Sequence, residues 1–186
     1  MLYNGRMADD KSFLNPSRLI ASIDIPSGGV AADFGAGSGF FAIPLAARVA
    51  AEGKVYAFDI RPDLLAQLRS NARLRHLLNI EAVVADLELP RATHLKDAVA
   101  DIVLVASILH QVGDKAAVLK EAARILKPGR MLVLIEWDQS KVAGGPPLSM
   151  RLAQSKAREL GEAAGFQADR EIAAGSHHYC LLFRRQ

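Results

Sequence analysis

Short apolar runs alternate with longer amphipathic segments along most of the chain. The apolar runs predict strands at Val30–Phe34, Val55–Asp59, Ile80–Ala85, Asp101–Ser107 and Met131–Trp137. Apolar residues that recur every three to four positions predict helices at Gly39–Glu52, Pro62–Leu74, Lys115–Leu126 and Leu148–Ala164. Two more strands, Phe166–Ala173 and Tyr179–Arg184, are expected at the end of the chain with only a turn region between them.

The alternation of strand and helix predicts a parallel sheet with helices on both faces. The last two strands have no helix between them, so they form a hairpin and one of them runs antiparallel to the rest. We therefore expect an α/β fold with a doubly wound, mostly parallel, seven-stranded sheet and an antiparallel C-terminal hairpin strand. Residues 30–186 are expected to form a single domain, preceded by an N-terminal segment, residues 1–29, that is a helix or a lid.

The composition agrees with one folded domain. The 186 residues are 51% hydrophobic and 23% charged, and Cys180 is the only cysteine, which excludes an internal disulfide. No metal site is expected. The net charge of +3 and the 6% of aromatic residues give no support to a nucleic-acid partner. The N-terminus lacks a signal-like apolar core, and the most apolar long window contains Asp33 and Arg48, so we expect no membrane span and a cytoplasmic location.

The strongest chemical signal is a glycine-rich loop directly after the first predicted strand. It reads Asp33-Phe-Gly35-Ala-Gly37-Ser-Gly39, and a helix is expected to follow it. Glycine permits tight turns and close approach of a ligand, and the N-terminus of a helix offers N–H groups to an anion. The spacing departs from the dinucleotide fingerprint because Phe40 follows the third glycine, and no Lys follows as in a Walker A loop. A purely structural turn is the alternative.

Two carboxylates follow the next strands on the same expected edge of the sheet. Asp59 ends the second strand, where an acidic residue can accept hydrogen bonds from a ribose diol. Asp86 ends the third strand, where it can receive an exocyclic amino group such as that of adenine. The alternatives are a cap for the following helix in the case of Asp59 and a solvated turn in the case of Asp86.

At this point the sequence resembles the class I S-adenosylmethionine-dependent methyltransferases. The resemblance rests on VAADFGAGSGFFAIPLA, KVYAFDIRPDLL, IEAVVADLELP and VADIVLVASILHQVGDKAAVLKEAARILKPGRMLVLIEW, and it extends from about Val30 to Arg184. The ILKPGRMLVLIEW stretch is similar to small ubiquinone/menaquinone-methyltransferase-like members. The resemblance implies a Rossmann-like methyltransferase fold, S-adenosyl-L-methionine as cofactor and transfer of its methyl group to an acceptor.

The resemblance also implies roles for individual residues. The first loop, with Asp33, Gly35, Ala36, Gly37 and Gly39, would surround the methionine part of the cofactor. The other implied cofactor contacts are Asp59 for the ribose, Ile60 against the adenine, Asp86 with Leu87 at the adenine amino group, and Ala106 and Ser107 near the sulfonium. Two features depart from the pattern of the family. The short stretch after Asp86 contains Pro90, which leaves no clear helix there. Pro44 lies inside the first predicted helix, where it either kinks the helix or occupies its first turns.

Methyl transfer needs alignment of donor and acceptor, and a base only when the acceptor starts protonated. The candidates for a base are His110, just beyond the fourth strand, and Glu136, at the end of the fifth. Either could instead pack beside the cavity. The candidates for acceptor contacts are Trp137, Arg151, His178 and Tyr179. His177 and His178 are adjacent in a strand and so point to opposite faces.

Two segments could cover the site: the Asp138–Leu148 loop, and the N-terminal residues Met1–Asn15 with the aromatic Tyr3 and Phe13. Because the core consumes nearly all of the chain, a small-molecule acceptor is expected. RNA or protein acceptors are the alternative, but Ala106-Ser-Ile-Leu stands where enzymes acting on planar amines carry an Asn-Pro-Pro-Tyr signature. A non-catalytic cofactor-binding module, a nicotinamide-dependent oxidoreductase and a homodimer paired through an edge strand also remain open.

Overall fold

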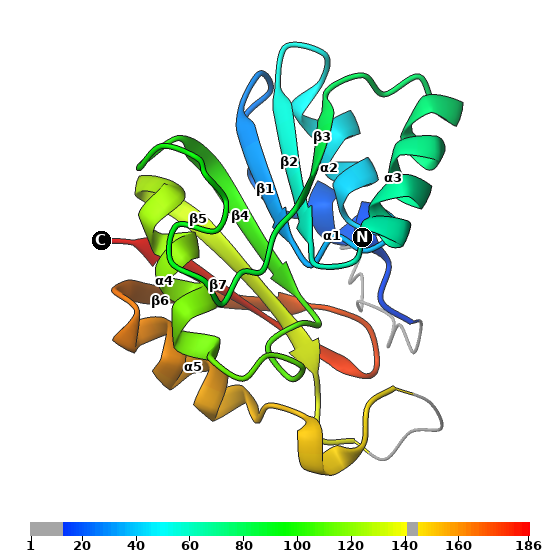
Figure 1. The fold of residues 1–186 in the computed structure, drawn as a ribbon. Helices are drawn as coiled ribbons and strands as arrows, with labels where there is room; N and C mark the ends of the chain where they lie inside the picture. Colours follow the sequence, from blue (N-terminus) through cyan, green and yellow to red (C-terminus); the bar gives the residue numbers. More distant parts are fainter. Residues whose placement is uncertain (1–12, 141–144) are drawn as a thin grey trace, which may run out of the picture.

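The computed structural model describes residues 13–140 and 145–186. They form a seven-stranded sheet with the order β3-β2-β1-β4-β5-β7-β6 (Figure 1). The strands are β1 (Val30–Phe34), β2 (Lys54–Asp59), β3 (Ile80–Val84), β4 (Ala100–Ala106), β5 (Leu126–Trp137), β6 (Phe166–Ala173) and β7 (His178–Arg185). The first five are parallel, and β7 is antiparallel to both β5 and β6. The predicted fold class and C-terminal hairpin are confirmed.

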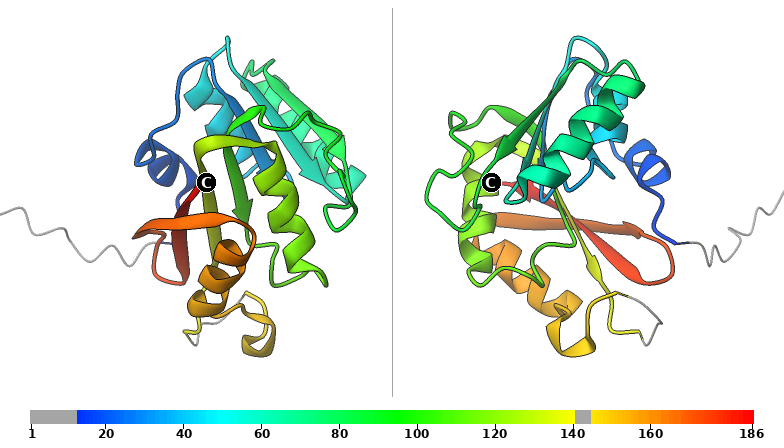
Figure 2. Two further views of the ribbon diagram at one scale, coloured as in Figure 1. Left: turned by 90° about the vertical axis from the view of Figure 1, so that its left-hand side faces the viewer. Right: turned by 45° about the vertical axis from the view of Figure 1, so that its right-hand side comes forward.

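Helices cover both faces of the sheet, as Figure 2 shows. One face carries α1 (Pro16–Ala21), α2 (Ala42–Val49) and α3 (Pro62–Leu74), and the other carries α4 (Lys115–Ile125) and α5 (Gln154–Ala163). Leu19 and Ile20 of α1 are buried in the same core as β1 and β2, so part of the N-terminal segment packs into the body of the fold. Among the described helices, none is long and apolar enough to cross a membrane.

Three sequence predictions are corrected by the structure. The first predicted helix is shorter than expected, because turns occupy residues 36–41 and α2 begins at Ala42. Pro44 therefore lies in the first turn, where its missing N–H has no helical partner to lose. The fifth strand starts at Leu126 rather than Met131, and its register against β4 shifts so that the Lys-Pro-Gly segment bulges out.

The third correction concerns the helix predicted at Leu148–Ala164. It is broken into a 3-10 turn, Leu148–Met150, and the helix α5. Arg151 has an extended backbone and is not part of a helix. Its side chain donates hydrogen bonds to the carbonyls of Asp138, Ser140 and Pro146. These bonds compete with helix continuation.

The sheet order places its topological switch point between β1 and β4, the neighbours at which the chain changes direction of winding. In open α/β sheets, ligands bind beside the carboxyl ends of the strands at this point. The described chain from Ala85 to Val99 crosses from β3 to β4 without a helix, as the position of Pro90 indicated. This crossing places Asp86 and Leu87 near the ends of β1 and β2.

Candidate active site

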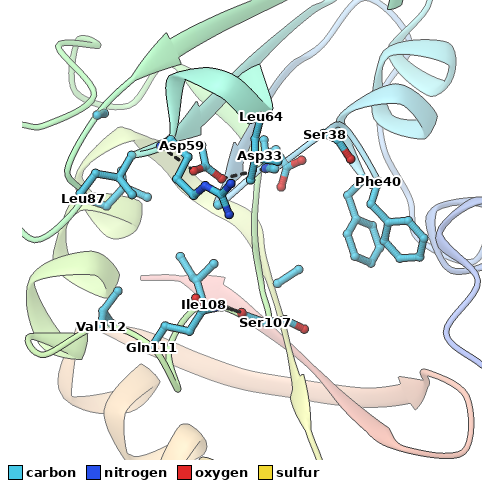
Figure 3. A pocket seen from close by; sticks show the side chains of 18 of the residues that line it. Asp33, Ser38, Phe40, Asp59, Leu64, Leu87, Ser107, Ile108, Gln111 and Val112 are labelled. Carbon is cyan, nitrogen blue, oxygen red and sulfur yellow. Dashed lines mark hydrogen bonds between the residues drawn. The ribbon is translucent and has the colours of Figure 1, made fainter. Parts of the chain in front are cut away.

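A cavity of about 900 Å³ lies beside the carboxyl ends of β1, β2 and β4. This volume is at the upper end of the ~300–1,000 Å³ range of small-molecule sites. One wall comes from the loops after β1, β2 and β3, and the facing wall comes from the segment after β4, as Figure 3 shows for Asp33 and Asp59 against Ser107 and Ile108.

The structure brings most of the expected cofactor residues to this cavity. Its lining includes Asp33, Gly35, Ala36, Gly37, Asp59, Ile60, Asp86, Leu87, Ala106 and Ser107, together with Trp137 and His178 from the expected acceptor contacts. Gly39, His110, Glu136, Arg151 and Tyr179 are not among the described lining residues.

The glycine-rich loop is folded by bonds to the neighbouring strand. The N–H groups of Gly35 and Ala36 both donate to the carbonyl of Phe58, at 2.8 and 2.9 Å, and that of Gly37 donates to Asp59 Oδ2 at 2.8 Å. These three donors are therefore used within the protein rather than offered to an anion. What the loop provides is close approach of a ligand to its backbone.

Glycine is required at two positions of the loop for different reasons. Gly35 has a φ of +78°, and a Cβ there would lie 2.0 Å from Cγ2 of Ile108, which crosses the cavity from the facing wall. Gly39 has a φ of +99°, and a Cβ there would press against Ile43 and Leu68 at 3.1 and 3.2 Å. Gly35 thus shapes the cavity, whereas Gly39 allows the packing of α2 against α3.

Asp33 is the most unusual side chain in the cavity. It is 1% exposed, and its Oδ2 has no hydrogen-bond partner among the described residues. Burial raises the pKa of Asp33 to about 7, an effect that the backbone N–H of Ala42 opposes and the nearby Asp59 carboxylate increases. A buried carboxylate oxygen without a donor is costly, so the site fits a ligand that brings a donor or a positive charge.

Asp59 and Asp86 each support a turn as well as line the cavity. Asp59 Oδ1 accepts from the N–H of Arg61 at 2.9 Å, just before α3, and Asp86 Oδ1 accepts from the N–H of Glu88 at 3.0 Å. The turn that was the alternative for Asp86 is therefore present, whereas the cap that was the alternative for Asp59 is wrong, because the N-cap residue of α3 is Arg61 and it makes no side-chain capping bond. Both carboxylates also line the cavity. A carboxylate oxygen has more than one lone pair, so these bonds leave room for ligand hydroxyl and amino groups.

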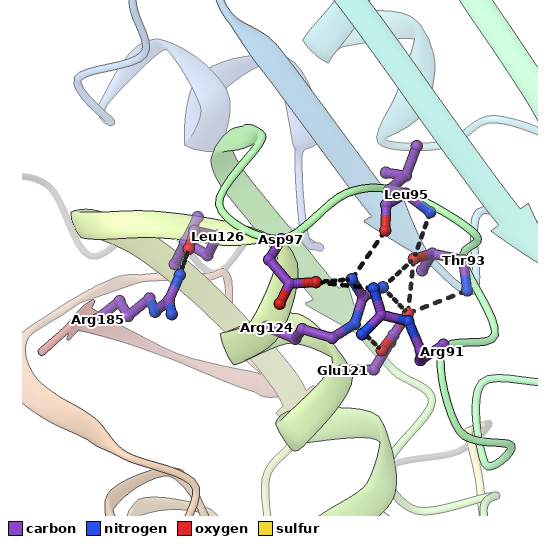
Figure 4. A network of polar contacts seen from close by, with 8 residues as sticks. All are labelled: Arg91, Thr93, Leu95, Asp97, Glu121, Arg124, Leu126 and Arg185. Atoms are coloured by element: carbon purple, nitrogen blue, oxygen red, sulfur yellow. Dashed lines mark hydrogen bonds and ion pairs between the residues drawn. The ribbon is translucent and has the colours of Figure 1, made fainter.

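The segment that carries Asp86 is held against α4 by a polar network around the buried Glu121 and Thr93 (Figure 4). Glu121 accepts from the N–H and the hydroxyl of Thr93, and Arg124 donates to Glu121, to Asp97 and to the carbonyl of Leu95. Sequence analysis did not identify this network. The helical spacing of Glu121 and Arg124 was visible, but their partners lie some thirty positions earlier in the chain, at Thr93 and Leu95.

His110 and Glu136 form a buried pair behind the cavity wall. Glu136 is fully buried; its Oε1 accepts from the N–H of Leu109 at 2.7 Å, and its Oε2 lies 2.8 Å from His110 Nδ1. The His110 side chain is 6% exposed. This geometry favours a role in fixing the segment after β4, and direct catalysis by either residue stays a prediction.

Arg151 and Tyr179 are also held by the protein itself. Arg151 is 7% exposed and bonds to the carbonyls of Pro146, Asp138 and Ser140. Tyr179 donates from its hydroxyl to the carbonyl of Leu152 at 3.0 Å. Contact of either side chain with an acceptor stays a prediction.

Several lining residues were not identified from sequence. Ile108, Gln111 and Val112 follow Ser107 in the segment after β4, and their signal was simply their place after a strand on the ligand edge. Ser107 has a φ of +55°, uncommon for a residue with a side chain and frequent at functional sites. Phe13, named from sequence as part of a covering segment, lines the cavity together with Leu14. Of the two covering segments expected from sequence, residues 1–12 of the N-terminal one and 141–144 of the Asp138–Leu148 loop lie outside the described residues.

The fold and the site define a class: an open α/β sheet with a glycine-rich loop after β1 and carboxylates after β1, β2 and β3. Residues 25–172 match the methyltransferase domain family. The chain belongs to this family, and its resemblance to the class I S-adenosylmethionine-dependent methyltransferases is confirmed.

Individual relatives agree with this assignment. A demethylmenaquinone methyltransferase of Bacillus mycoides is 31% identical over 123 residues, which cover 66% of this chain and 50% of that protein. The chain thus spans about half the length of the curated relatives it matches. A SAM-dependent methyltransferase from Aquifex aeolicus has the same fold, with a TM-score of 0.83, 23% identity, and 92% and 89% of the two chains covered. The [4+2]-cyclase SpnF also has this fold, with a TM-score of 0.77, 17% identity, and 91% and 80% covered.

Proposed function

We propose that this protein transfers a methyl group from S-adenosyl-L-methionine to a small-molecule acceptor in the cavity. The observation that carries the proposal is the arrangement of Asp33, Asp59 and Asp86 on one wall, facing a mostly apolar wall formed after β4. A carboxylate wall suits a cofactor that carries an ammonium group, a ribose diol and an adenine amine. The demethylmenaquinone methyltransferases among the relatives support a small-molecule acceptor.

The residues would divide the binding of the cofactor between them. Asp33 Oδ2 would accept from the ammonium of the methionine part, Asp59 would hold the ribose hydroxyls, and Asp86 with Leu87 would meet the adenine. When bound, the cofactor supplies an electrophilic methyl group on a sulfonium sulfur. Ala106 and Ser107 end β4 at the centre of the cavity, where they would line the space in which the acceptor meets that group.

The chain's contribution to rate is alignment and exclusion of water. Ile108 reaches across the cavity to Gly35, and Glu136 fixes the N–H of the next residue, Leu109. These contacts hold the facing wall at a defined distance from the carboxylate wall. Because an in-line displacement depends on the approach of donor and acceptor, a rigid spacing of this kind can supply much of the acceleration.

Titration calorimetry tests the cofactor assignment directly. We expect S-adenosylmethionine and S-adenosylhomocysteine to bind, and NADH and NADPH to give no heat of binding. Asp59→Asn is expected to weaken binding of S-adenosylhomocysteine by about 1–3 kcal/mol, because a ligand hydroxyl would lose its charged acceptor. The matched control is Asp24→Asn, since Asp24 is exposed and is not among the described lining residues of the cavity.

Asp59→Asn keeps one side-chain oxygen, which can still accept from one of the two backbone N–H groups that bond to Asp59. The melting temperature of the ligand-free variant therefore measures the structural role of Asp59 separately from its role in binding. Binding of a nicotinamide in place of the sulfur ligands would contradict the proposal. Binding of S-adenosylhomocysteine without methyl transfer to any acceptor would favour a non-methylating member of this fold, as the [4+2]-cyclase illustrates.

A further inference from the structure

The cavity lining also contains a pair of aromatic rings. Trp137 ends β5, and its register partner on the antiparallel strand β7 is His178. The two ring centroids are 4.2 Å apart with an interplanar angle of 43°. Both residues line the cavity, so they form one surface across two strands.

Trp137 is held from behind by the segment that follows β5. A Cβ on Gly145 would lie 2.7 Å from the Trp137 ring, so the backbone of Gly145 passes directly over it. The Arg151 guanidinium carbon lies 5.4 Å from the ring centroid, and the hydrogen bonds of that guanidinium to three carbonyls fix its place. The indole is therefore oriented before any ligand arrives, which lowers the entropic cost of binding against it.

The Nδ1 atom of His178 is the only buried side-chain nitrogen without a hydrogen-bond partner among the described residues. Burial lowers the pKa of His178, an effect that the charges of Asp138 and Glu136 oppose and those of His177 and Arg151 reinforce. The imidazole is thus neutral at neutral pH. A neutral imidazole nitrogen without a proton can accept one hydrogen bond from a ligand.

The lining beside this pair, as far as the structure describes it, presents no formally charged side chain to the cavity. The described lining residues from the N-terminal segment and from β4 onward are Phe13, Leu14, Ala106, Ser107, Ile108, Gln111, Val112, Trp137 and His178. None of these is a carboxylate, a lysine or an arginine. A charged acceptor would lose its hydration here without gaining a partner, and that loss is costly.

We propose that Trp137 and His178 form the acceptor subsite, and that it takes an uncharged, flat molecule whose hydroxyl group donates to His178 Nδ1. The indole provides a platform for the ring of the acceptor, and the imidazole fixes its orientation. The inference rests on the proposed function, because it takes the carboxylate wall to be occupied by the cofactor.

Trp137 makes the test direct, because it is the only tryptophan in the chain. The protein, saturated with S-adenosylhomocysteine, is titrated with p-cresol while tryptophan emission is excited at the long-wavelength edge. The comparison probes share the ring: 4-methylanisole has its hydroxyl blocked, 4-methylbenzoate is an anion and 4-methylbenzylammonium is a cation. We expect a saturable change with p-cresol, and at least tenfold weaker binding of the two charged probes. Equal binding of a charged probe, or no saturable change with p-cresol, would overturn the proposal.

His178→Phe separates the hydrogen bond from the stacking, because phenylalanine keeps a ring beside Trp137. We expect this variant to weaken p-cresol binding about threefold to tenfold, the value of one neutral hydrogen bond, and to leave 4-methylanisole binding unchanged. The matched control is His177→Phe, since His177 lies against Phe13 and outside the described lining. An equal loss for both probes, or no loss for either, would contradict the role of Nδ1.

Failure of the subsite and failure of the proposed function give different results. Calorimetry of S-adenosylhomocysteine, repeated on His178→Phe, reports the cofactor site alone and is expected to be unchanged. Loss of cofactor binding in the unmodified protein would refute the proposed function, whereas normal cofactor binding without the p-cresol response would refute only the acceptor subsite.

Discussion

Asp33 and Glu136 are two buried carboxylates at the carboxyl ends of parallel strands, and they differ in one respect. Glu136, on β5, accepts hydrogen bonds from the segment after β4 through both of its oxygens. Asp33, on β1, has one oxygen with no partner in the described structure, and its pKa is raised to about 7. Sequence analysis treated both as functional candidates because both lie near the carboxyl end of a strand, on the ligand edge of the sheet.

The difference teaches that position on the ligand edge is not enough to assign a role. A buried carboxylate whose bonds are all made within the protein holds the structure together, whereas one that lacks a bond is available to a ligand. The same distinction separates Tyr179, whose hydroxyl is bonded, from His178, whose Nδ1 is not. Among the described residues, the two unsatisfied buried side-chain atoms therefore belong to the two regions proposed to bind the cofactor and the acceptor.

Glu136→Ala gives the largest expected effect on stability. It leaves the N–H of Leu109 and the ring of His110 without their acceptor and opens a void in the core, so the free energy of unfolding should fall by about 3–5 kcal/mol. Chemical denaturation measures this change. The control Glu159→Ala, at an exposed residue of α5 that pairs with Lys156, should change it by less than about 0.5 kcal/mol. Full stability of Glu136→Ala would show that the carboxylate does not hold this segment.

Asp33→Asn should have opposite effects on cofactor binding and on stability. Binding of S-adenosylhomocysteine should weaken by roughly 10–100-fold, the value of a charged hydrogen bond. The ligand-free variant should be more stable than the parent by about 1–3 kcal/mol at pH 8, because the parent buries an ionised oxygen without a donor. A variant that is less stable at pH 8 and binds normally would place the ligand elsewhere.

The sign of the pH effect follows from the raised pKa of Asp33. The pKa of Asp33 is about 7 in the folded state, above its ordinary value of 3.8, so the folded protein holds a proton that the unfolded chain releases. The stability from this group is complete below pH 3.8 and is lost as the pH rises to about 7. The advantage of Asp33→Asn should therefore shrink between pH 8 and pH 4. Denaturation curves at several pH values measure it.

Cofactor affinity should show the reverse dependence on pH. The ammonium group of the ligand prefers ionised Asp33, so below a pH of about 7 binding must first release the proton. Affinity should fall by up to tenfold for each pH unit below that value, and binding should release protons to the buffer. Calorimetry in buffers of different ionisation enthalpy measures the release. If the affinity of Asp33→Asn showed the same dependence on pH, the released proton would come from a group other than Asp33.

The fold could be predicted from sequence because local patterns determine it. The buried strands, the Pro62–Leu74 helix and the turn before β6 each have a signal within a few residues. The errors lie where distant contacts override the local pattern. Arg151 lies within an apparently continuous helix, yet its bonds to residues 5 to 13 positions earlier break that helix.

Like the fold, the candidate site could be predicted from sequence only where a local pattern marks it. The carboxylates and glycines after β1, β2 and β3 are marked by their spacing, and the structure brings most of them to one cavity. No local pattern shows that Glu136 is bonded internally, because its partners Leu109 and His110 lie some 26 positions earlier in the chain, or that His178 Nδ1 lacks a partner. The pairing of Trp137 with His178 depends on the register between β5 and β7, which the sequence does not display.

Tyr179→Phe gives the smallest expected effect. It tests, beside β5 and β7, whether hydrogen bonding within the protein separates structural residues from ligand-binding residues. Removing the hydroxyl deprives the carbonyl of Leu152 of its donor, so the free energy of unfolding should fall by about 1 kcal/mol. Since that hydroxyl is bonded within the protein, binding of p-cresol to the complex with S-adenosylhomocysteine should not change. Tryptophan emission and chemical denaturation measure the two quantities on one sample. Weaker p-cresol binding at full stability would mean that Tyr179 contacts the acceptor, and bonding within the protein would then fail to separate structural from ligand-binding residues.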